Sequence, residues 1–327
     1  MSDTERSRSG NRATTGVNQG TAVTGSKRKQ FKVLGRPLGF EHWALLPLLL
    51  FFLAFVIIPV FELVRLGFST VTLSQGGLVR EFNGLSNFYA MLEDKIFWVS
   101  LLNTMVFVAA AVILQLILGT LFALLVERAR FLSGLARNVI VWPAIVTPVA
   151  VGATWWLLLN IEFGLFNYVL DALGLPQQTW LASTTWALPT LIVVDVWHWT
   201  PVVFLFVLAG LANIDHTLYE AARVDGASEW RVFRSITLPL LAPMLVVAAI
   251  TRIILGFKVF DEIFLLTGGG PGSSTEVIST YIQEVFVQQT EFGYGAFLSL
   301  TIITVLIGLF AIYALSNFLI GKVRHEG

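Results

Sequence analysis

The stretch EAARVDGASEWRVFRSITLPLLAP, residues 220–243, decides how this chain folds, because it is the most polar internal segment of an otherwise apolar sequence. Of the 327 residues, 56% are hydrophobic and only 13% are charged, and the mean hydropathy is +0.77. Soluble domains carry about 25% charged residues. The composition therefore indicates a membrane protein, and the polar stretch predicts a segment that leaves the membrane.

Apolar segments on both sides of this stretch are long enough to cross a membrane. A spanning helix needs about 20 apolar residues. Six segments approach or exceed this length: 43–61, 96–126, 138–161, 186–211, 240–266 and 292–320. The sequence therefore predicts an all-α membrane protein with six transmembrane helices, which places both termini on one side of the membrane.

The distribution of Lys and Arg predicts which side that is. Cytoplasmic loops of membrane proteins are enriched in these residues. The two tails and the loops around 128–137 and 223–234 together hold 16 of the 21 Lys and Arg residues. The opposite loops clearly hold only Arg80 and Lys95, with Arg65 near the end of the first span. We therefore expect both termini, and the loop at 213–243, to be cytoplasmic.

The first 36 residues differ from the rest. They are rich in Ser, Thr, Gly and Asn and contain eight of the 21 Lys and Arg residues. Such a segment buries too little apolar surface to fold, and it lacks the apolar core and cleavage site of a secretory signal. We expect residues 1–36 to form a disordered, basic cytoplasmic tail and residues 37–327 to form the membrane domain.

The polar loop predicts two short helices. Asp215 and Ser228 are suited to cap their amino-terminal ends. Gly226 suits the left-handed position that follows the end of the first helix. Pro239 then lies at the start of the fifth span, where a missing N–H costs little. A helix at the membrane surface that only connects two spans, or a helix that docks into the groove of a partner, both fit this pattern.

The spacing of residues within the loop resembles a known motif. Glu-Ala-Ala is followed after three residues by Gly, after nine more by Ile, and after one more by Leu-Pro. This pattern is similar to the EAA loop of ATP-binding-cassette (ABC) importer permeases. The residues that carry it, with Asp225 beside the glycine, are Glu220, Ala221, Ala222, Asp225, Gly226, Ile236, Leu238 and Pro239.

The resemblance implies a type I ABC importer permease fold and a non-catalytic transport subunit. In that family the loop docks on a cytoplasmic ATPase, here with Glu220 in contact and Gly226 setting the bend. It also implies a second permease subunit, two copies of the ATPase and an extracytoplasmic solute-binding protein. ATP and Mg²⁺ would bind the ATPase, and this chain would bind no cofactor.

Further segments point to one branch of the family. Residues 103–130 are similar to its second span, and residues 195–211 and 257–277 resemble the MalF/UgpA-like subunit of carbohydrate importers. This resemblance implies a sugar, polyol or sugar-phosphate as the transported solute. It also implies a multi-pass protein of the bacterial or archaeal cytoplasmic membrane.

A charged side chain inside a membrane has a high free-energy cost, so the charged residues of the predicted spans are functional candidates. Asp195 lies about 13 Å from the outer end of the fourth span, and Arg252 about 15 Å from the inner end of the fifth, at 1.5 Å per residue. We expect the two to pair across the helices or to face a common cavity. A role confined to helix packing is the alternative.

Other polar and aromatic residues of the spans are weaker candidates for the substrate path. Lys258 has Asp261 and Glu262 at helical i+3 and i+4 spacing, which permits an ion pair within one helix. Trp197 is deep enough to stack on a sugar, whereas Trp155 and Trp156 fit an interfacial aromatic belt. Asn103 and Gln115 could line the path or form interhelical hydrogen bonds.

Several function classes find no support in the sequence. Cysteine is absent, the four histidines are scattered, and the net charge is zero, so neither a metal or nucleophile cluster nor nucleic-acid binding is indicated. The glycine-rich run at 267–275 lacks the G-x-x-x-x-G-K-[ST] pattern of a nucleotide-binding loop and is expected to be a flexible outer loop. An ion-coupled secondary transporter or channel that uses Asp195 and Arg252 is the alternative function.

Overall fold

The computed structural model describes residues 32–33, 36–37, 40–74, 77–129 and 133–325. The chain divides into two compact units, residues 1–58 and residues 59–327. The described part is helical except for two pairs of short strands. A mostly helical protein is therefore confirmed.

The first unit contains a small strand pair and most of one long helix. Strands β1 (Lys32–Val33) and β2 (Arg36–Pro37) are antiparallel, and helix α1 (Phe40–Gly67) follows them and continues into the second unit. The apolar side chains of α1 from Leu45 to Ile58 are exposed, as expected of a helix that lies in lipid. The tail predicted to be disordered lies almost entirely outside the described residues.

The second unit contains the remaining elements. Its membrane-depth elements are α3 (Lys95–Arg128), α4 (Ser133–Val141), the 3-10 turn η1 (Trp142–Ile145), α5 (Pro148–Leu158), α7 (Ala187–Ala212), α10 (Leu238–Phe257), α11 (Asp261–Leu266) and α13 (Phe292–His325). Its connecting elements are β3 (Ser69–Ser74), β4 (Gly77–Phe82), α2 (Ser86–Glu93), α6 (Leu165–Ala172), α8 (His216–Val224), α9 (Glu229–Val232), the π-helical turn η2 (Phe233–Thr237) and α12 (Ile278–Val287).

Five helices of the described chain are long and apolar enough to cross a membrane, and a bent pair raises the number to six if it forms one span. The bent pair comprises residues 134–145 and 148–158, whose axes differ by 95°. The sequence predicted a third span over 138–161, and the structure has this bent pair there. Pro143 and Pro148 flank the bend, and neither has an N–H with which to continue a helix.

The fifth predicted span, 240–266, is also interrupted. Helix α10 ends at Phe257, and α11 begins only at Asp261. The Ser279 hydroxyl donates a hydrogen bond to the Val259 carbonyl within this break. Non-helical backbone at membrane depth is tolerated where the protein supplies such partners. The break places Lys258 outside the helix that holds Asp261 and Glu262.

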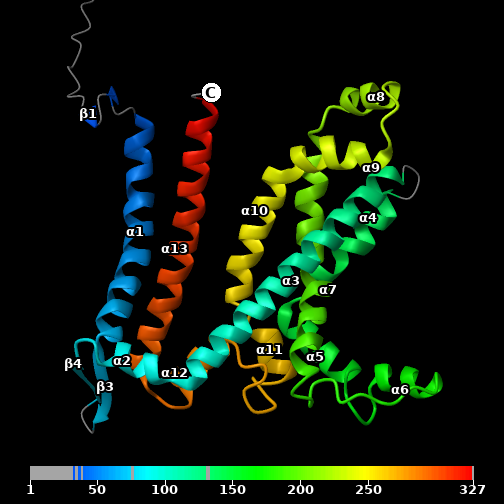
Figure 1. Ribbon diagram of the computed structural model, residues 1–327. Coiled ribbons are helices and arrows are strands. Elements are labelled where there is room, and N and C mark those ends of the chain that lie inside the picture. The colour runs from blue at the N-terminus through cyan, green and yellow to red at the C-terminus, as the bar shows by residue number, and fades with distance from the viewer. Residues whose placement is uncertain (1–31, 34–35, 38–39, 75–76, 130–132, 326–327) are drawn as a thin grey trace, which may run out of the picture. The chain divides into compact units, whose positions relative to one another are not determined.

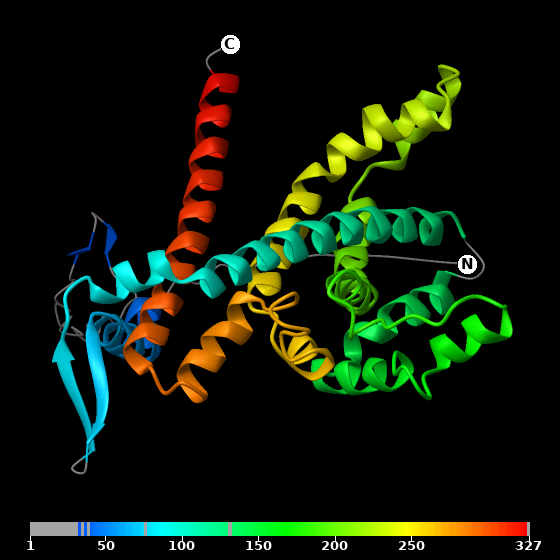
Figure 2. The ribbon, with the colours of Figure 1, turned by 60° about the horizontal axis from the view of Figure 1, so that its bottom comes forward.

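Helices α3 and α7 form the centre of the second unit and are crossed by α10 (Figures 1 and 2). They pack tightly at Gly119, where an added Cβ would lie 2.8 Å from Val203 Cγ1 and 2.9 Å from the Phe204 amide nitrogen. The buried apolar side chains of Val203, Phe204 and Leu241 belong to the cluster at this contact. Close helix contact through a small residue is the usual basis of packing in membranes.

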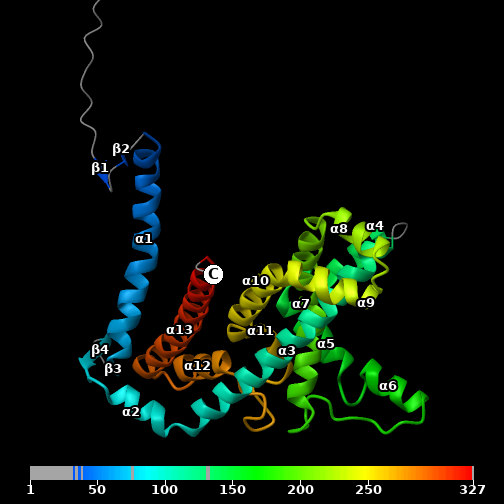
Figure 3. The ribbon, with the colours of Figure 1, turned by 45° about the horizontal axis from the view of Figure 1, so that its top comes forward.

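The second unit has two distinct ends. Helices α8 and α9 lie together at one end, as Figures 1 and 3 show. At the opposite end lie α5, α6, α11, α12 and the hairpin of β3 and β4 (Figures 1 and 2). The predicted polar loop is therefore separated from the glycine-rich loop at 267–275 by the length of the spanning helices.

Candidate functional site: the polar loop and the intramembrane charge cluster

The polar loop forms the two short helices that its sequence predicted. The Asp215 carboxylate accepts a hydrogen bond from the Thr217 amide at 2.9 Å and caps α8. This backbone bond, with one from the Thr217 hydroxyl, lowers the pKa of Asp215 below its ordinary value. The Ser228 hydroxyl accepts from the Arg231 amide and caps α9. Both predicted caps are confirmed.

The turn between the two helices is built around Gly226, whose φ is 73°. The Gly226 amide donates to the Arg223 carbonyl at 3.1 Å, and the Ala227 amide donates to the Ala222 carbonyl at 2.9 Å. These two bonds form a Schellman motif, which satisfies carbonyls at the helix end. The loop therefore has a defined bend, and Gly226 is the residue whose conformation permits it.

Two contacts attach the loop to the spanning helices. The Tyr219 hydroxyl lies 3.2 Å from the Thr237 hydroxyl, just before α10. Arg128, at the end of α3, forms an ion pair with Glu229 of α9 at 2.6 Å. Pro239 lies in the first turn of α10, as predicted. These contacts link α8 to the residue before α10 and α9 to the end of α3.

The outer surface of the loop carries apolar side chains that the described chain does not cover. Leu218 is 43% exposed, Trp230 is 68% exposed and Val224 is 88% exposed. The side chains of Glu220, Ala221 and Asp225 are exposed beside them, whereas Ala222 is buried against the chain. Exposed apolar residues rimmed by charges are typical of a surface that binds another protein.

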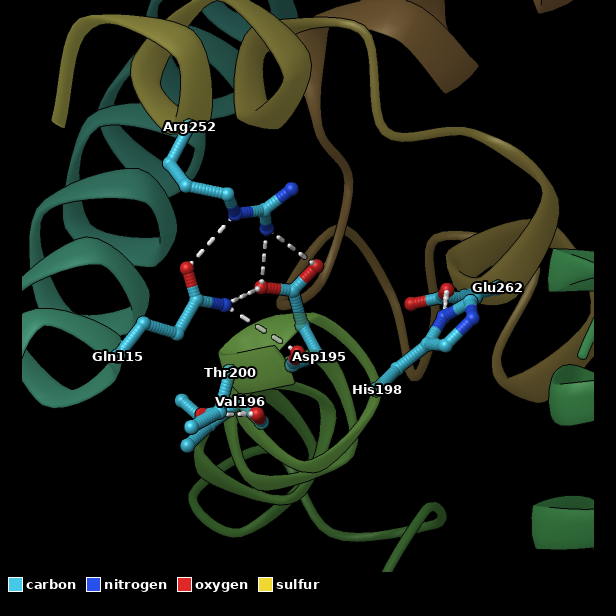
Figure 4. A network of polar contacts seen from close by, with 7 residues as sticks. All are labelled: Gln115, Asp195, Val196, His198, Thr200, Arg252 and Glu262. Atoms are coloured by element: carbon cyan, nitrogen blue, oxygen red, sulfur yellow. Dashed lines mark hydrogen bonds and ion pairs between the residues drawn. The ribbon is translucent and has the colours of Figure 1, made fainter. Parts of the chain in front are cut away.

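A cluster of charged and polar side chains lies among α3, α7 and α10 (Figure 4). The Arg252 guanidinium lies 3.0 Å from the Asp195 carboxylate, and both side chains are 2% exposed. Gln115 closes the ring, since its amide nitrogen donates to Asp195 at 2.7 Å and its carbonyl accepts from Arg252 Nε at 2.7 Å. The guanidinium also lies 5.0 Å from the centre of the Trp199 ring.

This cluster shows how the three helices are held together. Of the two arrangements the sequence suggested for Asp195 and Arg252, the structure has the direct pair. For Gln115 the sequence left open a place in the path or an interhelical hydrogen bond, and the structure has hydrogen bonds to both charged residues. A buried ion pair is stable only when its remaining polar atoms are also hydrogen-bonded, and Gln115 fulfils that requirement here.

A second buried pair was not found by sequence analysis. His198 Nδ1 lies 2.5 Å from the Glu262 carboxylate, and His198 Nε2 lies 3.1 Å from the Val146 carbonyl oxygen. His198 follows Asp195 by three residues and faces α11 (Figure 4). A histidine inside an apolar span, one turn from a buried aspartate, was the available indication. Its partners could not be identified, because both lie in segments that are interrupted in the structure, and hydropathy does not report such breaks.

The predicted ion pair within the fifth span is not formed. Lys258 lies at the end of α10, and neither Asp261 nor Glu262 pairs with it in the described chain. The physical reason is the break at 258–260, which removes the helical i+3 and i+4 geometry. Glu262 is buried and pairs with His198, whereas the side chains of Lys258 and Asp261 are exposed.

The remaining residues predicted for the substrate path have different surroundings. Trp197 is 40% exposed, and its ring lies edge-on to that of Trp155 at 5.5 Å. The Asn103 amide donates to the Ser273 and Glu276 carbonyls, each at 3.0 Å. Asn103 therefore attaches α3 to the glycine-rich loop.

That loop is not the loosely held segment that we expected. Thr275 is buried, and its hydroxyl lies 2.7 Å from the Gly270 carbonyl and 2.8 Å from the Thr267 hydroxyl. Gly269 has a φ of 90°, a backbone conformation that favours glycine. The loop is a folded cap beside α11. Within the described residues, no group of three or more His, Asp or Glu could hold a metal ion.

The fold and the loop can be compared with known proteins. A family model described as "Binding-protein-dependent transport system inner membrane component" matches residues 115–324, which include the loop and the charge cluster. The chain belongs to this family. It is therefore a multi-pass permease subunit of the inner membrane and a non-catalytic component of a binding-protein-dependent ABC importer.

Individual relatives agree with this assignment. The chain is 37% identical over 298 residues to the "Trehalose/maltose transport system permease protein MalF" of Thermococcus litoralis, covering 90% of this chain and 98% of the relative. It is 35% identical over 258 residues to the "Sulfoquinovosyl glycerol transport system permease protein SmoG" of Agrobacterium fabrum, covering 79% and 83% of the two chains.

A solved structure supports the fold. A chain from a bacterial ABC transporter involved in the import of the acidic polysaccharide alginate has a TM-score of 0.72 and 24% identity, covering 84% of this chain and 94% of that one. This permease therefore shares the fold of an ABC importer permease. The family assignment decides against the alternative of an ion-coupled transporter or channel.

Proposed function

We propose that this permease forms half of the translocation path for a sugar, polyol or sugar-phosphate, which an extracytoplasmic solute-binding protein delivers. Support for the solute class comes from relatives whose names specify trehalose/maltose and sulfoquinovosyl glycerol transport. The solute-binding protein follows from the description of the family as binding-protein-dependent.

The proposed topology has six spans in a type I importer arrangement, with both termini in the cytoplasm. It treats the bent pair at 134–145 and 148–158 as one span. The membrane domain would cover residues 37–327, and residues 1–36 would be a disordered tail. The concentration of Lys and Arg in the tails and in the loop at 213–243 supports this orientation.

The proposed partners are a second permease chain and two copies of a cytoplasmic ATPase, which would bind ATP and Mg²⁺. The loop of α8 and α9 would dock on the ATPase through Glu220 and the exposed apolar side chains beside it. The observation that carries this proposal is the loop itself, since it combines an uncovered apolar surface with a rigid, doubly hydrogen-bonded turn. Its ties to α3 and α10 would transmit the motion.

The residues predicted for the substrate path would then have two kinds of role. Trp197, Lys258 and Asp261 have exposed side chains, and we assign them to the wall of the path. Asp195, Arg252, Glu262 and Asn103 are bonded to other parts of the chain, and we assign them to shaping that wall from behind. An exposed tryptophan face is suited to stacking on the apolar side of a sugar ring.

Reconstitution of the complete importer tests the coupling role. Glu220→Lys should reduce the ATPase activity that the liganded binding protein stimulates, while the complex still assembles. Glu93→Lys, at the exposed end of α2 and outside the loop, is the matched control and should leave stimulation unchanged. Undiminished stimulation in an assembled Glu220→Lys complex would show that the loop is not the site of coupling.

A second experiment tests the solute class. The cognate binding protein is screened by thermal shift against mono- and disaccharides, polyols, sugar phosphates and amino acids. Stabilisation by a member of the first four groups is expected. Stabilisation by amino acids alone would exclude the proposed class without affecting the coupling role.

A further inference from the structure

His198 is surrounded by hydrogen-bond acceptors. Its side chain is fully buried, and that of Glu262 is 4% exposed. On one side, Nδ1 lies 2.5 Å from a Glu262 carboxylate oxygen, and on the other, Nε2 lies 3.1 Å from the Val146 carbonyl oxygen. A peptide carbonyl can only accept a hydrogen bond, so Nε2 must carry a proton.

The hydrogen-bond partners determine how many protons His198 and Glu262 hold together. A neutral imidazole has one N–H, and Nε2 already uses it. With an ionised Glu262, Nδ1 and the carboxylate would then be two acceptors 2.5 Å apart. Only an additional proton between them removes this conflict. It belongs either to an imidazolium paired with a carboxylate or to a carboxylic acid that donates to Nδ1.

The neighbouring charges are consistent with the additional proton. Asp195 on α7 and Arg252 on α10 form an ion pair at 3.0 Å and balance each other. On α11, Asp261 is exposed, as is Lys258 at the end of α10, and residues 142–158 contain no ionisable side chain. The buried cluster is therefore electrically neutral only if His198 and Glu262 together hold the proton. A net charge in a membrane interior is strongly disfavoured.

The pair connects the two interrupted spans. Val146 lies at the 95° bend of the third span, where the following Thr147-Pro148 segment cannot continue the preceding helix. Its carbonyl obtains a partner from His198. Glu262 lies in the first turn of α11, just after the break that ends α10. His198 thus binds one atom from each irregular segment to the continuous helix α7.

We propose that His198 and Glu262 are positioning residues that share one proton, and that this proton holds the bent third span and α11 against α7. Removal of the proton leaves Nδ1 and the carboxylate as facing acceptors. The contact should therefore weaken as the pH rises, whichever of the two residues formally carries the proton. The proposal does not depend on the identity of the transported solute.

Spectroscopy of the assembled importer in lipid tests the protonation directly. Histidine ring ¹⁵N labels are assigned with His198→Gln, and the exposed His216 of α8 serves as the internal control. At neutral pH, we expect either a protonated Nδ1 in His198 or an infrared carboxylic-acid band that Glu262→Gln removes. A His198 ring that carries a proton on Nε2 alone at this pH, with no such band, would overturn the proposal.

Variants separate the shared proton from simple packing. In Glu262→Gln, the side-chain amide can donate to Nδ1 while Nε2–H still donates to Val146, so every bond is retained with a neutral imidazole. We expect this variant to keep an unfolding temperature near that of the wild type at neutral pH. When the pH becomes alkaline, the unfolding temperature of Glu262→Gln should fall less than that of the wild type. Glu262→Ala, which leaves Nδ1 without a partner, should be less stable at both.

The pH profile of ATPase activity stimulated by the binding protein provides the functional measurement. Wild-type stimulation should decline on the alkaline side more steeply than stimulation of Glu262→Gln. Identical alkaline declines of stability and stimulation in the two proteins would refute a shared proton. Both proteins are compared in the same complete importer with the same solute. The comparison therefore remains valid if the solute belongs to another class.

Discussion

Replacing Asp195 by Asn should destabilise the membrane domain by about 3–5 kcal/mol, the usual cost of removing one partner from a buried ion pair. The substitution preserves the shape of the side chain but leaves the Arg252 guanidinium, 2% exposed, without a counter-charge. Gln115 cannot compensate for this loss, because its amide supplies no net charge. Arg252→Gln should cost a similar amount, since it leaves Asp195 uncompensated.

The geometry supports this magnitude. At an N–O separation of 3.0 Å and an effective dielectric constant of about 20, the attraction between the two charges is roughly 5–6 kcal/mol. Desolvation of the two ions offsets much of it, so the intact pair contributes little net stability. The double variant, Asp195→Asn with Arg252→Gln, contains neither ion. It should therefore cost less than the sum of the single variants, by about 0.5–3 kcal/mol.

The assay is equilibrium denaturation of the purified importer in mixed micelles, from which the free energy of unfolding of each variant is obtained. The exposed pair of Arg128 and Glu229 is the control. Its N–O distance is shorter, at 2.6 Å, but the two side chains are 67% and 65% exposed. Exposed pairs contribute only about 0.2–1 kcal/mol, so Glu229→Gln should have a small effect.

Additivity would refute this reasoning. If the two single effects sum to that of the double variant within about 0.5 kcal/mol, the residues are not energetically coupled. Equal losses of stability in Asp195→Asn and Glu229→Gln would also contradict the reasoning. Burial would then have no influence on how much an ion pair contributes to the free energy of unfolding.

Three further predictions concern other parts of the chain. Gly119→Ala should weaken the contact of α3 with α7. Thermal unfolding should show a loss of stability of about 1–3 kcal/mol from overpacking. The control Gly308→Ala, whose added Cβ has no atom within 4 Å, should be neutral or slightly stabilising. Gly226→Ala meets no neighbouring atom but must adopt a φ of 73°, so it should cost about 1 kcal/mol locally and reduce stimulated ATPase activity; full activity would show that the bend is dispensable. Asp94 is partly buried, which acts to raise its pKa, but hydrogen bonds from two tyrosine hydroxyls and two backbone amides outweigh burial and hold the pKa below its ordinary value. Its contribution to stability should therefore be present at neutral pH and be lost as the pH falls through the lowered pKa, and Asp94→Asn should remove this acid dependence of the unfolding temperature.

The polar loop shows how much local sequence can determine. Its caps, the left-handed glycine and the proline at the start of α10 all depend on residues within a few positions of one another. Each is therefore set by local backbone chemistry, and each was predictable. The length and apolar character of α3, α7 and α13 were equally evident, since a bilayer imposes a minimum length on any helix that crosses it.

The interrupted spans show where local reasoning ended. Hydropathy reports the composition of a segment but not the path of its backbone, so it did not show the interruptions within residues 138–161 and 240–266. Pro143 and Pro148 lack the N–H that would continue a helix, but the 95° angle of the bend is a feature of the tertiary structure. The sequence also did not place His198 beside Glu262, because the break after α10 decides where Glu262 lies.

The sequence by itself thus determined the membrane environment, the polar loop with its two helices, and the presence of costly charges inside the spans. Those features depend on composition and on short-range spacing. Only the tertiary structure decided which charges meet, since Asp195 joins Arg252 through Gln115, and Glu262 joins His198 and not Lys258. The physical reason is that a buried charge must find a partner in three dimensions, and that partner is fixed by how the helices break and cross.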